Sequence, residues 1–341
     1  MANDARLPLT SMVCRRAHWD TEWLRKWEAR FSEADPDGRL RPSPAVRFHR
    51  KNWEWLAIAQ ALSERGMLER GRRGCGFAVG MEPLASLFAA SGAEVLATDL
   101  GAADEAAKAW TTTGQHAATL EALYWPGFVS RAEFDARVRF MPQDMRALEP
   151  DRLGHFDFIW SSCSFEHLGS LEAGLQFVLR STELLKPGGF AVHTTELNLS
   201  SDDATVETGD SVIYRRRDLA ALAHRLRLIG CAMAPLEDFA GIDDEDIEYD
   251  YEPYYGNGRE HIKMMLGGFV TTSCLLIIRK GRFPAVLSPA AMSEPVLMPE
   301  AGPAGSGPHD AARLRAEIAA LKASCSWRVT APLRALARRL R

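Results

Sequence analysis

A turn that contains glycine, set between two short apolar runs, constrains the fold of this chain more than any other feature. Residues 75–79 (CGFAV) are predicted to form a buried strand, and Gly80 lies in the tight turn that follows. Pro83 suits the first position of a helix over residues 84–91, and residues 94–98 (EVLAT) form a second strand. A strand, a helix and a second strand in this order predict a parallel βαβ unit, and therefore an α/β sheet.

The second strand delivers a carboxylate at its carboxyl end. Asp99 follows Gly80 by 19 residues. This spacing places the carboxylate where it can accept hydrogen bonds from both ribose hydroxyls of a nucleoside that lies across the first turn. The sequence therefore predicts a nucleoside-containing cofactor at the edge of the sheet.

A nicotinamide dinucleotide is the weaker of the two cofactor classes that fit this pattern. Gly74, Gly76 and Gly80 form a superficial G-x-G-x-x-x-G. However, the segment before Gly74 (ERGRR) is not a strand, and Gly76 lies inside the apolar run instead of after it. Glu82 would also place a negative charge where the pyrophosphate belongs. An NAD(P)-dependent enzyme is kept as a minor alternative.

The composition divides the chain into four parts. Residues 1–70 are expected to form an N-terminal helical cap, because their apolar residues recur at helical spacing. Residues 71–282 alternate short apolar runs with amphipathic segments, which predicts the catalytic α/β domain. Residues 283–309 are rich in Pro, Ala, Gly and Ser and are expected to be a linker, and residues 310–341 form a basic helical tail.

Charge and cysteine content exclude some classes of protein. The net charge of −4 argues against electrostatic binding to nucleic acid. The six cysteines show no ligand spacing, so neither a metal site nor a disulfide framework is predicted. With neither a secretory leader nor a membrane-spanning run apparent, a cytoplasmic location is expected.

The order of several motifs resembles class I S-adenosylmethionine-dependent methyltransferases over residues 75–280. The resemblance covers GFAVGMEPLA, the acid Asp99, Asp144 in FMPQDM, the strand FDFIWSSCSFEHL, and LLKPGGFAVHTTE. It implies a Rossmann-like, doubly wound, mostly parallel sheet of seven strands whose last strand, in GGFVTTSCLLII, is antiparallel. It also implies S-adenosylmethionine as the cofactor.

The resemblance assigns cofactor-binding roles by position. Asp99 would hold the ribose, and Asp144 would accept a hydrogen bond from the adenine amino group. The family's acid-x-Gly-x-Gly-x-Gly motif is reduced to its central glycine, Gly80, so Glu82 either replaces the missing acid or only complements the dipole of the following helix. The complete set of predicted cofactor residues is Gly76, Ala78, Gly80, Glu82, Asp99, Leu100, Asp144, Met145, Ser161 and Ser162.

Candidate catalytic groups follow the fourth and fifth strands. Methyl transfer from a sulfonium needs donor and acceptor in line and a base for the proton of a weakly acidic hydroxyl. His167 is the first candidate base, Glu196 is the second, and Glu166 lies beside His167. Each has an ordinary structural alternative, such as packing at a helix start or a satisfied carboxylate at the rim.

Accessory segments bear on the acceptor. FHRKNWEW (residues 48–55) is a candidate lid, and GIDDEDIEYDYEPYYGNGREHIK is a loop of acids and tyrosines that suits a polyhydroxylated ligand or is a solvated excursion. The tail SWRVTAPLRAL resembles C-terminal sequences of bacterial enzymes that build surface polysaccharides. We therefore expect O-methylation of a small-molecule or glycan acceptor, with the tail contacting a membrane surface or a glycosyltransferase partner. A binding or scaffold protein that keeps the fold without turnover is the competing class.

Overall fold

The computed structural model describes residues 8–38, 48–101, 116–117, 119–237, 248–255 and 259–282. The chain divides into two units, residues 1–294 and 295–341, and every described residue belongs to the first. The predicted linker and the predicted basic tail therefore lie outside the described residues.

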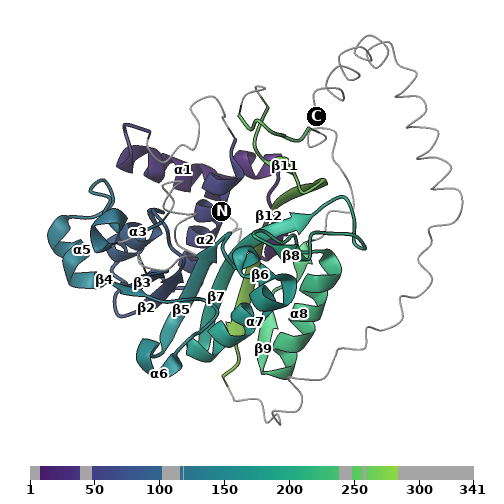
Figure 1. Ribbon diagram of the computed structural model, residues 1–341. Coiled ribbons are helices and arrows are strands. Elements are labelled where there is room, and N and C mark those ends of the chain that lie inside the picture. Colours follow the sequence, from purple (N-terminus) through teal and green to yellow (C-terminus); the bar gives the residue numbers. More distant parts are fainter. Residues whose placement is uncertain are drawn as a thin grey trace, which may run out of the picture. The chain divides into compact units, whose positions relative to one another are not determined.

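A single mixed sheet organises the described part of the chain (Figure 1). Its strands run in the order β10-β1-β12-β7-β5-β2-β3-β4, and β9 and β11 also pair with β12. The strands of this sheet are β1 (Ser11–Val13), β2 (Arg73–Phe77), β3 (Glu94–Asp99), β4 (Val138–Pro142), β5 (Phe156–Ser162), β7 (Leu185–Asn198), β9 (Cys231–Met233), β10 (Leu236–Glu237), β11 (Lys263–Leu266) and β12 (Phe269–Lys280). A separate two-stranded antiparallel sheet pairs β6 (Gly169–Ser170) with β8 (Thr208–Gly209).

The strand directions confirm the predicted fold class. β4, β3, β2, β5 and β7 are mutually parallel neighbours, and β12 lies antiparallel to β7 along nine paired residues, from Phe190 to Asn198. The described sheet has ten strands where seven were predicted. Short strands, among them β1 and β10, extend it beyond the predicted set.

Helices cover both faces of the sheet, as a doubly wound fold requires (Figure 1). One face packs against α1 (Glu22–Ala34), α2 (Arg50–Ser63), α3 (Leu84–Ala90) and α5 (Arg131–Arg137). The other face packs against α6 (Pro150–Leu153), α7 (Leu171–Ser181) and α8 (Arg216–Leu228). Short 3₁₀ helices are η1 (Arg16–Asp20), η2 (Leu120–Leu123), η3 (Phe165–His167) and η4 (Thr182–Leu184).

The described part of the N-terminal segment is mainly helical and also contributes a strand. Met12 of β1 pairs with Leu275 of β12, and both are buried. α2 packs its buried face, which includes Trp53 and Leu56, into the same apolar core as the sheet. This packing holds the polar start of α2 over the carboxyl ends of the central strands, where it meets Ser162 and Thr194.

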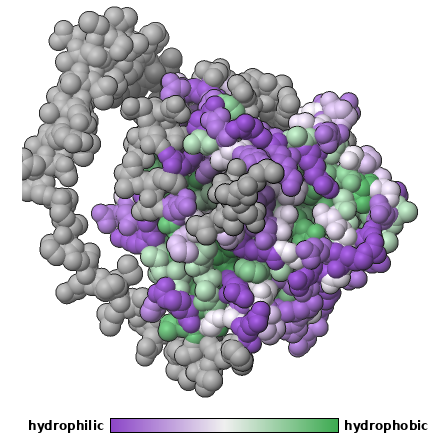
Figure 2. All heavy atoms as spheres, turned by 180° about the vertical axis from the view of Figure 1, so that it is seen from behind, coloured by the Kyte–Doolittle hydropathy of each residue, from purple (hydrophilic) through white to green (hydrophobic). Residues whose placement is uncertain are grey.

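The surface is mixed in character. Hydrophilic and hydrophobic residues are interspersed over the face seen from behind (Figure 2). Met81, in the turn after β2, and Tyr251 are the large hydrophobic side chains most exposed among the described residues, at 47% and 44%. Within the described ranges, no helix is both long and apolar enough to cross a bilayer.

Candidate functional site

The turn after β2 and the end of β3 form the first part of the site, which we call the Asp99 edge (Ala78, Gly80, Asp99 and Leu100). Ala78 and Gly80 both have positive φ angles, 47° and 51°, so the chain reverses tightly after β2. The Asp99 carboxylate accepts hydrogen bonds from the backbone N–H groups of Gly80 at 3.0 Å, Leu100 at 2.8 Å and Ala117 at 3.2 Å. The predicted proximity of Asp99 to the first turn is therefore present.

The Asp99 carboxylate is buried, with 6% of the residue exposed, and does not point into solvent. Burial raises its pKa above the usual value, and the three backbone donors oppose this shift. A carboxylate offers roughly four acceptor positions, so the three N–H groups leave capacity for about one more donor. A role of Asp99 in binding a ribose stays a prediction.

Gly76 and Glu82, both predicted to bind the cofactor, have structural partners within the fold. A Cβ on Gly76 would lie 2.3 Å from the Trp160 ring, so glycine is required there by packing. Trp160 Nε1 donates a 2.6 Å hydrogen bond to Glu82 Oε1. Burial raises the pKa of Glu82 to about 8, which favours the neutral acid at neutral pH. A cofactor contact by either residue stays a prediction.

The other predicted cofactor residues lie in varied surroundings. Asp144 pairs with the Arg146 guanidinium through both carboxylate oxygens, at 2.7 to 3.0 Å. The Met145 side chain packs in the apolar core on the α7 face. Ser161 Oγ lies 2.8 Å from His193 Nδ1, and neighbouring Ser162 contacts α2 on the opposite face. Their roles as cofactor contacts also stay predictions.

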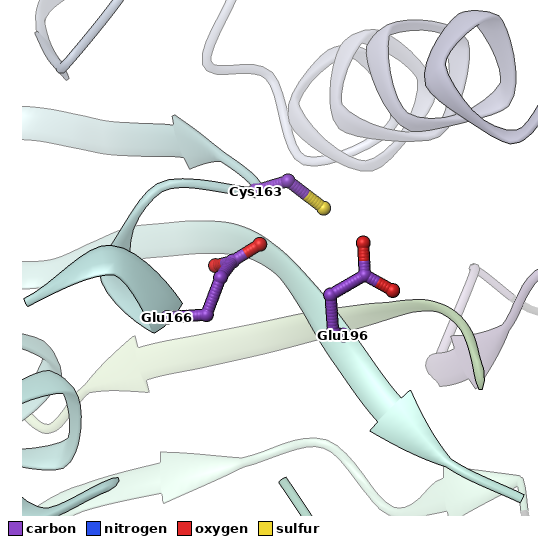
Figure 3. A group of neighbouring side chains, drawn as sticks. All are labelled: Cys163, Glu166 and Glu196. Carbon is purple, nitrogen blue, oxygen red and sulfur yellow. The ribbon is translucent and has the colours of Figure 1, made fainter. Parts of the chain in front are cut away.

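A second group of side chains, the buried ionic cluster, lies beyond the carboxyl ends of β5 and β7. Its members come from three segments and are Arg50, Lys51 and Glu54 from α2, Cys163 and Glu166 from the segment after β5, and Glu196 from β7. Arg50 Nη1 lies 2.5 Å from Glu196 Oε1 and 3.3 Å from Glu54 Oε1. Two of the three predicted catalytic residues, Glu166 and Glu196, therefore meet in one place (Figure 3).

Glu54 is the centre of the cluster and was missed at the sequence level. It is fully buried, forms an ion pair with Lys51 at 3.0 Å and accepts a 2.5 Å hydrogen bond from Ser273 Oγ. Although burial alone would raise its pKa, Lys51 and Arg50 together lower it to about 2. Arg50 and Lys51 stand four and three residues before Glu54, a helical spacing that could have identified it.

Glu166 is the carboxyl group of the cluster with a raised pKa. Its Oε2 accepts a 3.2 Å hydrogen bond from Thr195, while its buried Oε1 has no hydrogen-bond partner. Burial, with the charge of Glu196, raises its pKa to about 8. Two cations, Arg50 and Lys51, already balance Glu54 and Glu196, so a neutral Glu166 leaves the cluster without net charge.

Three possible metal-ligating side chains, Cys163, Glu166 and Glu196, lie close together beside the Arg50 guanidinium. Ligand atoms of Cys163, Glu166 and Glu196 all lie within 4.8 Å of one another and point toward one another in Figure 3. Arg50 Nη1 lies 3.8 Å from Cys163 Sγ as well as against Glu196, and thus provides a positive charge there. The expectation of no metal site stays a prediction. Burial raises the pKa of the Cys163 thiol well above its usual value, which disfavours a thiolate nucleophile.

His167, the first predicted base, is half-buried on η3. Its Nδ1 lies 2.7 Å from the Asp210 carbonyl oxygen, to which a ring N–H donates. Burial lowers its pKa, which keeps the ring neutral near pH 7. The accessory segments reach the site as well, because His49 at the start of α2 stacks on His261 from the end of the acidic-aromatic loop, with ring centroids 4.6 Å apart. Residues 241–247 and 256–258 of that loop lie outside the described residues.

The strand order, the antiparallel last strand and the acid beyond β3 define a Rossmann-like, doubly wound α/β protein. No family model and no curated protein matches the sequence. Similar solved structures include the magnesium protoporphyrin IX methyltransferase from Synechocystis PCC 6803 with bound SAH, at 11% identity and a TM-score of 0.44, covering 76% of this chain and 96% of that one.

Two further solved structures are also similar. The glycopeptide N-methyltransferase MtfA complexed with sinefungin has 15% identity and a TM-score of 0.41, with 67% of this chain and 94% of that chain covered. Phosphoethanolamine N-methyltransferase 2 from Haemonchus contortus, in complex with S-adenosyl-L-methionine, has 16% identity and a TM-score of 0.40 over 64% of this chain and 51% of that one. Likeness at this level concerns the course of the chain and transfers neither substrate nor activity.

Proposed function

We propose that this chain is an S-adenosylmethionine-dependent methyltransferase that methylates a hydroxyl oxygen of a sugar or glycan. The observation that carries the proposal is the Asp99 carboxylate, which is fixed by the Gly80 turn at the carboxyl end of β3. In an open α/β sheet this edge is where a nucleoside binds, and a carboxylate there recognises ribose hydroxyls. The cofactor would supply the methyl group as a sulfonium.

The buried ionic cluster supports transfer chemistry at the neighbouring strand ends. The cluster as a whole carries no net charge, because Arg50 and Lys51 balance Glu54 and Glu196, but it places two of the candidate bases, Glu166 and Glu196, at these strand ends. Deprotonation of an acceptor hydroxyl needs a base, for which His167, Glu196 and Glu166 are the candidates inferred from sequence. Arg50 already forms an ion pair with the Glu196 carboxylate.

We further propose that the acceptor belongs to the synthesis of a cell-surface polysaccharide. This proposal is supported by the tail sequence SWRVTAPLRAL and by the tyrosines of the acidic-aromatic loop, whose rings can stack on sugars. The tail would bring the enzyme to a membrane surface or to a glycosyltransferase.

A scaffold function without turnover is favoured by one observation. Side chains of this chain already provide hydrogen-bond partners for most polar groups of the buried ionic cluster. Glu54, for example, accepts hydrogen bonds from both Ser162 and Ser273. A site already closed in this way suits a protein that binds a ligand or a partner without transferring a group.

Isothermal titration calorimetry with S-adenosylmethionine and S-adenosylhomocysteine separates these functions. We expect both ligands to bind, and we expect transfer of tritiated methyl from S-adenosylmethionine to a member of a panel of nucleotide sugars and lipid-linked glycans. Binding without transfer to any panel member supports the scaffold function. Binding of neither ligand overturns the methyltransferase proposal. In the same assay, His167→Ala lowers turnover and leaves cofactor affinity nearly intact if His167 is the base.

A further inference from the structure

His261 belongs to a polar group beside the ionic cluster that the proposed function does not use. Its Nδ1 lies 2.7 Å from Oδ2 of Asp250, a fully buried residue. Asp250 is itself held by the backbone N–H groups of Tyr251 at 2.9 Å and Tyr255 at 3.2 Å. A carboxylate fixed in this way places the ring proton on Nδ1 and leaves the lone pair on Nε2.

Three aromatic rings enclose the His261 imidazole. His49 stacks on it at 4.6 Å between centroids, Tyr255 is tilted against it at 4.8 Å, and Tyr254 meets it edge-on at 5.5 Å. The His49 ring has the opposite tautomer, because its Nδ1 accepts the Lys51 backbone N–H at 3.0 Å and its Nε2 faces the Tyr255 hydroxyl at 3.1 Å. The two stacked imidazoles are therefore not equivalent, since a carboxylate backs only His261.

The backbone ties His261 to the start of α2. Its N–H donates to the Phe48 carbonyl at 3.1 Å, and the Arg50 N–H donates to the His261 carbonyl at 2.9 Å. Arg50 in turn pairs with Glu196. His261 thus lies beside the buried ionic cluster, where the charged groups that act on it are Asp250, Arg50 and Glu196. Burial lowers the pKa of His261 although Asp250 opposes the shift, so the ring is neutral at pH 7.

We propose that His261 is the catalytic base for the acceptor hydroxyl and that Asp250 is its positioning residue. This inference rests on the proposed methyltransferase function. As the acceptor oxygen bonds to the methyl carbon, the carbon–sulfur bond breaks and its electron pair stays on sulfur. The hydroxyl proton passes to Nε2 of His261 and from there to water, while Asp250 stabilises the transient imidazolium.

The same geometry favours His261 over His167. The Nδ1 of His167 faces a neutral carbonyl, that of Asp210, whereas the Nδ1 of His261 faces a carboxylate. A carboxylate orients the imidazole and also stabilises the imidazolium that forms when Nε2 accepts a proton.

The first test needs no acceptor and uses the intact chain labelled with ¹⁵N-histidine. Long-range ¹H–¹⁵N spectra at pH 7 are expected to show His261 as the neutral Nδ1–H tautomer, and saturation with S-adenosylhomocysteine is expected to shift its Nε2 signal. The exposed His224, changed to Gln in a matched variant, assigns an unaffected control signal. An Nε2–H tautomer, an imidazolium, or no response to bound S-adenosylhomocysteine overturns the proposal.

Kinetics on the acceptor found in the panel gives the second test. His261→Ala is expected to lower kcat at least 100-fold with less than a twofold change in the calorimetric Kd for S-adenosylhomocysteine, and added imidazole is expected to restore part of the rate. Asp250→Asn is expected to lower kcat and shift its pH profile. Unchanged kcat in folded His261→Gln overturns His261 as the base, whereas absent cofactor binding by the wild type overturns the methyltransferase function itself.

Discussion

The Asp99 edge and the buried ionic cluster lie at the same end of one sheet but are built in different ways. The Asp99 edge depends on contacts close in sequence. The Asp99 carboxylate accepts hydrogen bonds from Gly80, 19 residues before it, and from Leu100, directly after it. The buried ionic cluster joins α2 to β5 and β7. Glu54 accepts hydrogen bonds from Ser162 and Thr194, which lie 108 and 140 residues after it in the sequence. The Asp99 carboxylate keeps spare hydrogen-bonding capacity, whereas the buried ionic cluster is a network whose polar groups mostly have partners within the chain.

This difference indicates that the two regions contribute differently to stability and to ligand binding. A carboxylate held by backbone amides needs no ligand for the chain to fold, and it can still accept a hydroxyl. A cluster of opposite charges must be complete before it is stable in a buried position. We therefore expect changes at the cluster to act mainly on stability and changes at the edge to act mainly on ligand binding.

The largest effect is expected for Glu54→Ala. Its loss leaves the largely buried Arg50 and the partly exposed Lys51 with one carboxylate fewer, which should lower the free energy of unfolding by about 3–5 kcal/mol. Urea denaturation measures this change. Glu121→Ala, which removes an exposed partner of Arg131, is the matched control and should cost no more than about 1 kcal/mol. Equal effects in the two variants would remove the distinction between the cluster and an ordinary surface pair.

The contrast between the two regions also sets what the sequence could predict. The β2–α3–β3 unit and the position of Asp99 were predictable because a turn, a helix and a strand signal act over 25 neighbouring residues, 75–99. Glu196 and Glu166 were found through their places after apolar runs. The ion pair of Arg50 with Glu196 and the contact of Glu54 with Cys163 were not predictable, because they depend on how α2 packs across the sheet. The added strand β1 escaped prediction because it has three residues.

Asp99→Ala is expected to give the next largest effect, on binding. Removal of a charged acceptor for ribose hydroxyls should weaken S-adenosylhomocysteine by about 1.5–3 kcal/mol, roughly 10- to 150-fold in Kd. Calorimetry measures the change, and Asp135→Ala, on the exposed face of α5, is the control. An unaltered Kd in a folded Asp99→Ala protein would contradict the binding role of the edge.

Gly76→Ala tests the packing beneath the edge. The added Cβ would lie 2.3 Å from the Trp160 ring and 2.5 Å from Val79, so the free energy of unfolding should fall by about 1–3 kcal/mol. At Gly101 the same substitution meets only an ordinary 3.8 Å contact with Pro142 and should be nearly neutral. Thermal unfolding of both variants checks the pair, and a stable Gly76→Ala protein would show that this glycine is not required by packing.

The last expected effect is on the pH dependence of stability. Because the folded state raises the pKa of Glu166 from 4.5 to about 8, its contribution to stability is fully present below pH 4.5 and is lost as the pH rises through 8. Glu166→Gln should remove this part of the slope, which is at most about 1.4 kcal/mol per pH unit between pH 4.5 and 8. Denaturation at several pH values measures it, and parallel curves for the two proteins would show that Glu166 does not hold the extra proton.

A structure of the chain with S-adenosylhomocysteine bound tests the central claim most directly. We predict both ribose hydroxyls next to Asp99, with at least one within roughly 2.5–3.2 Å of a carboxylate oxygen while the Gly80 N–H bond is kept. A nucleoside bound elsewhere, with Asp99 still bonded only to its backbone amides, would contradict the account.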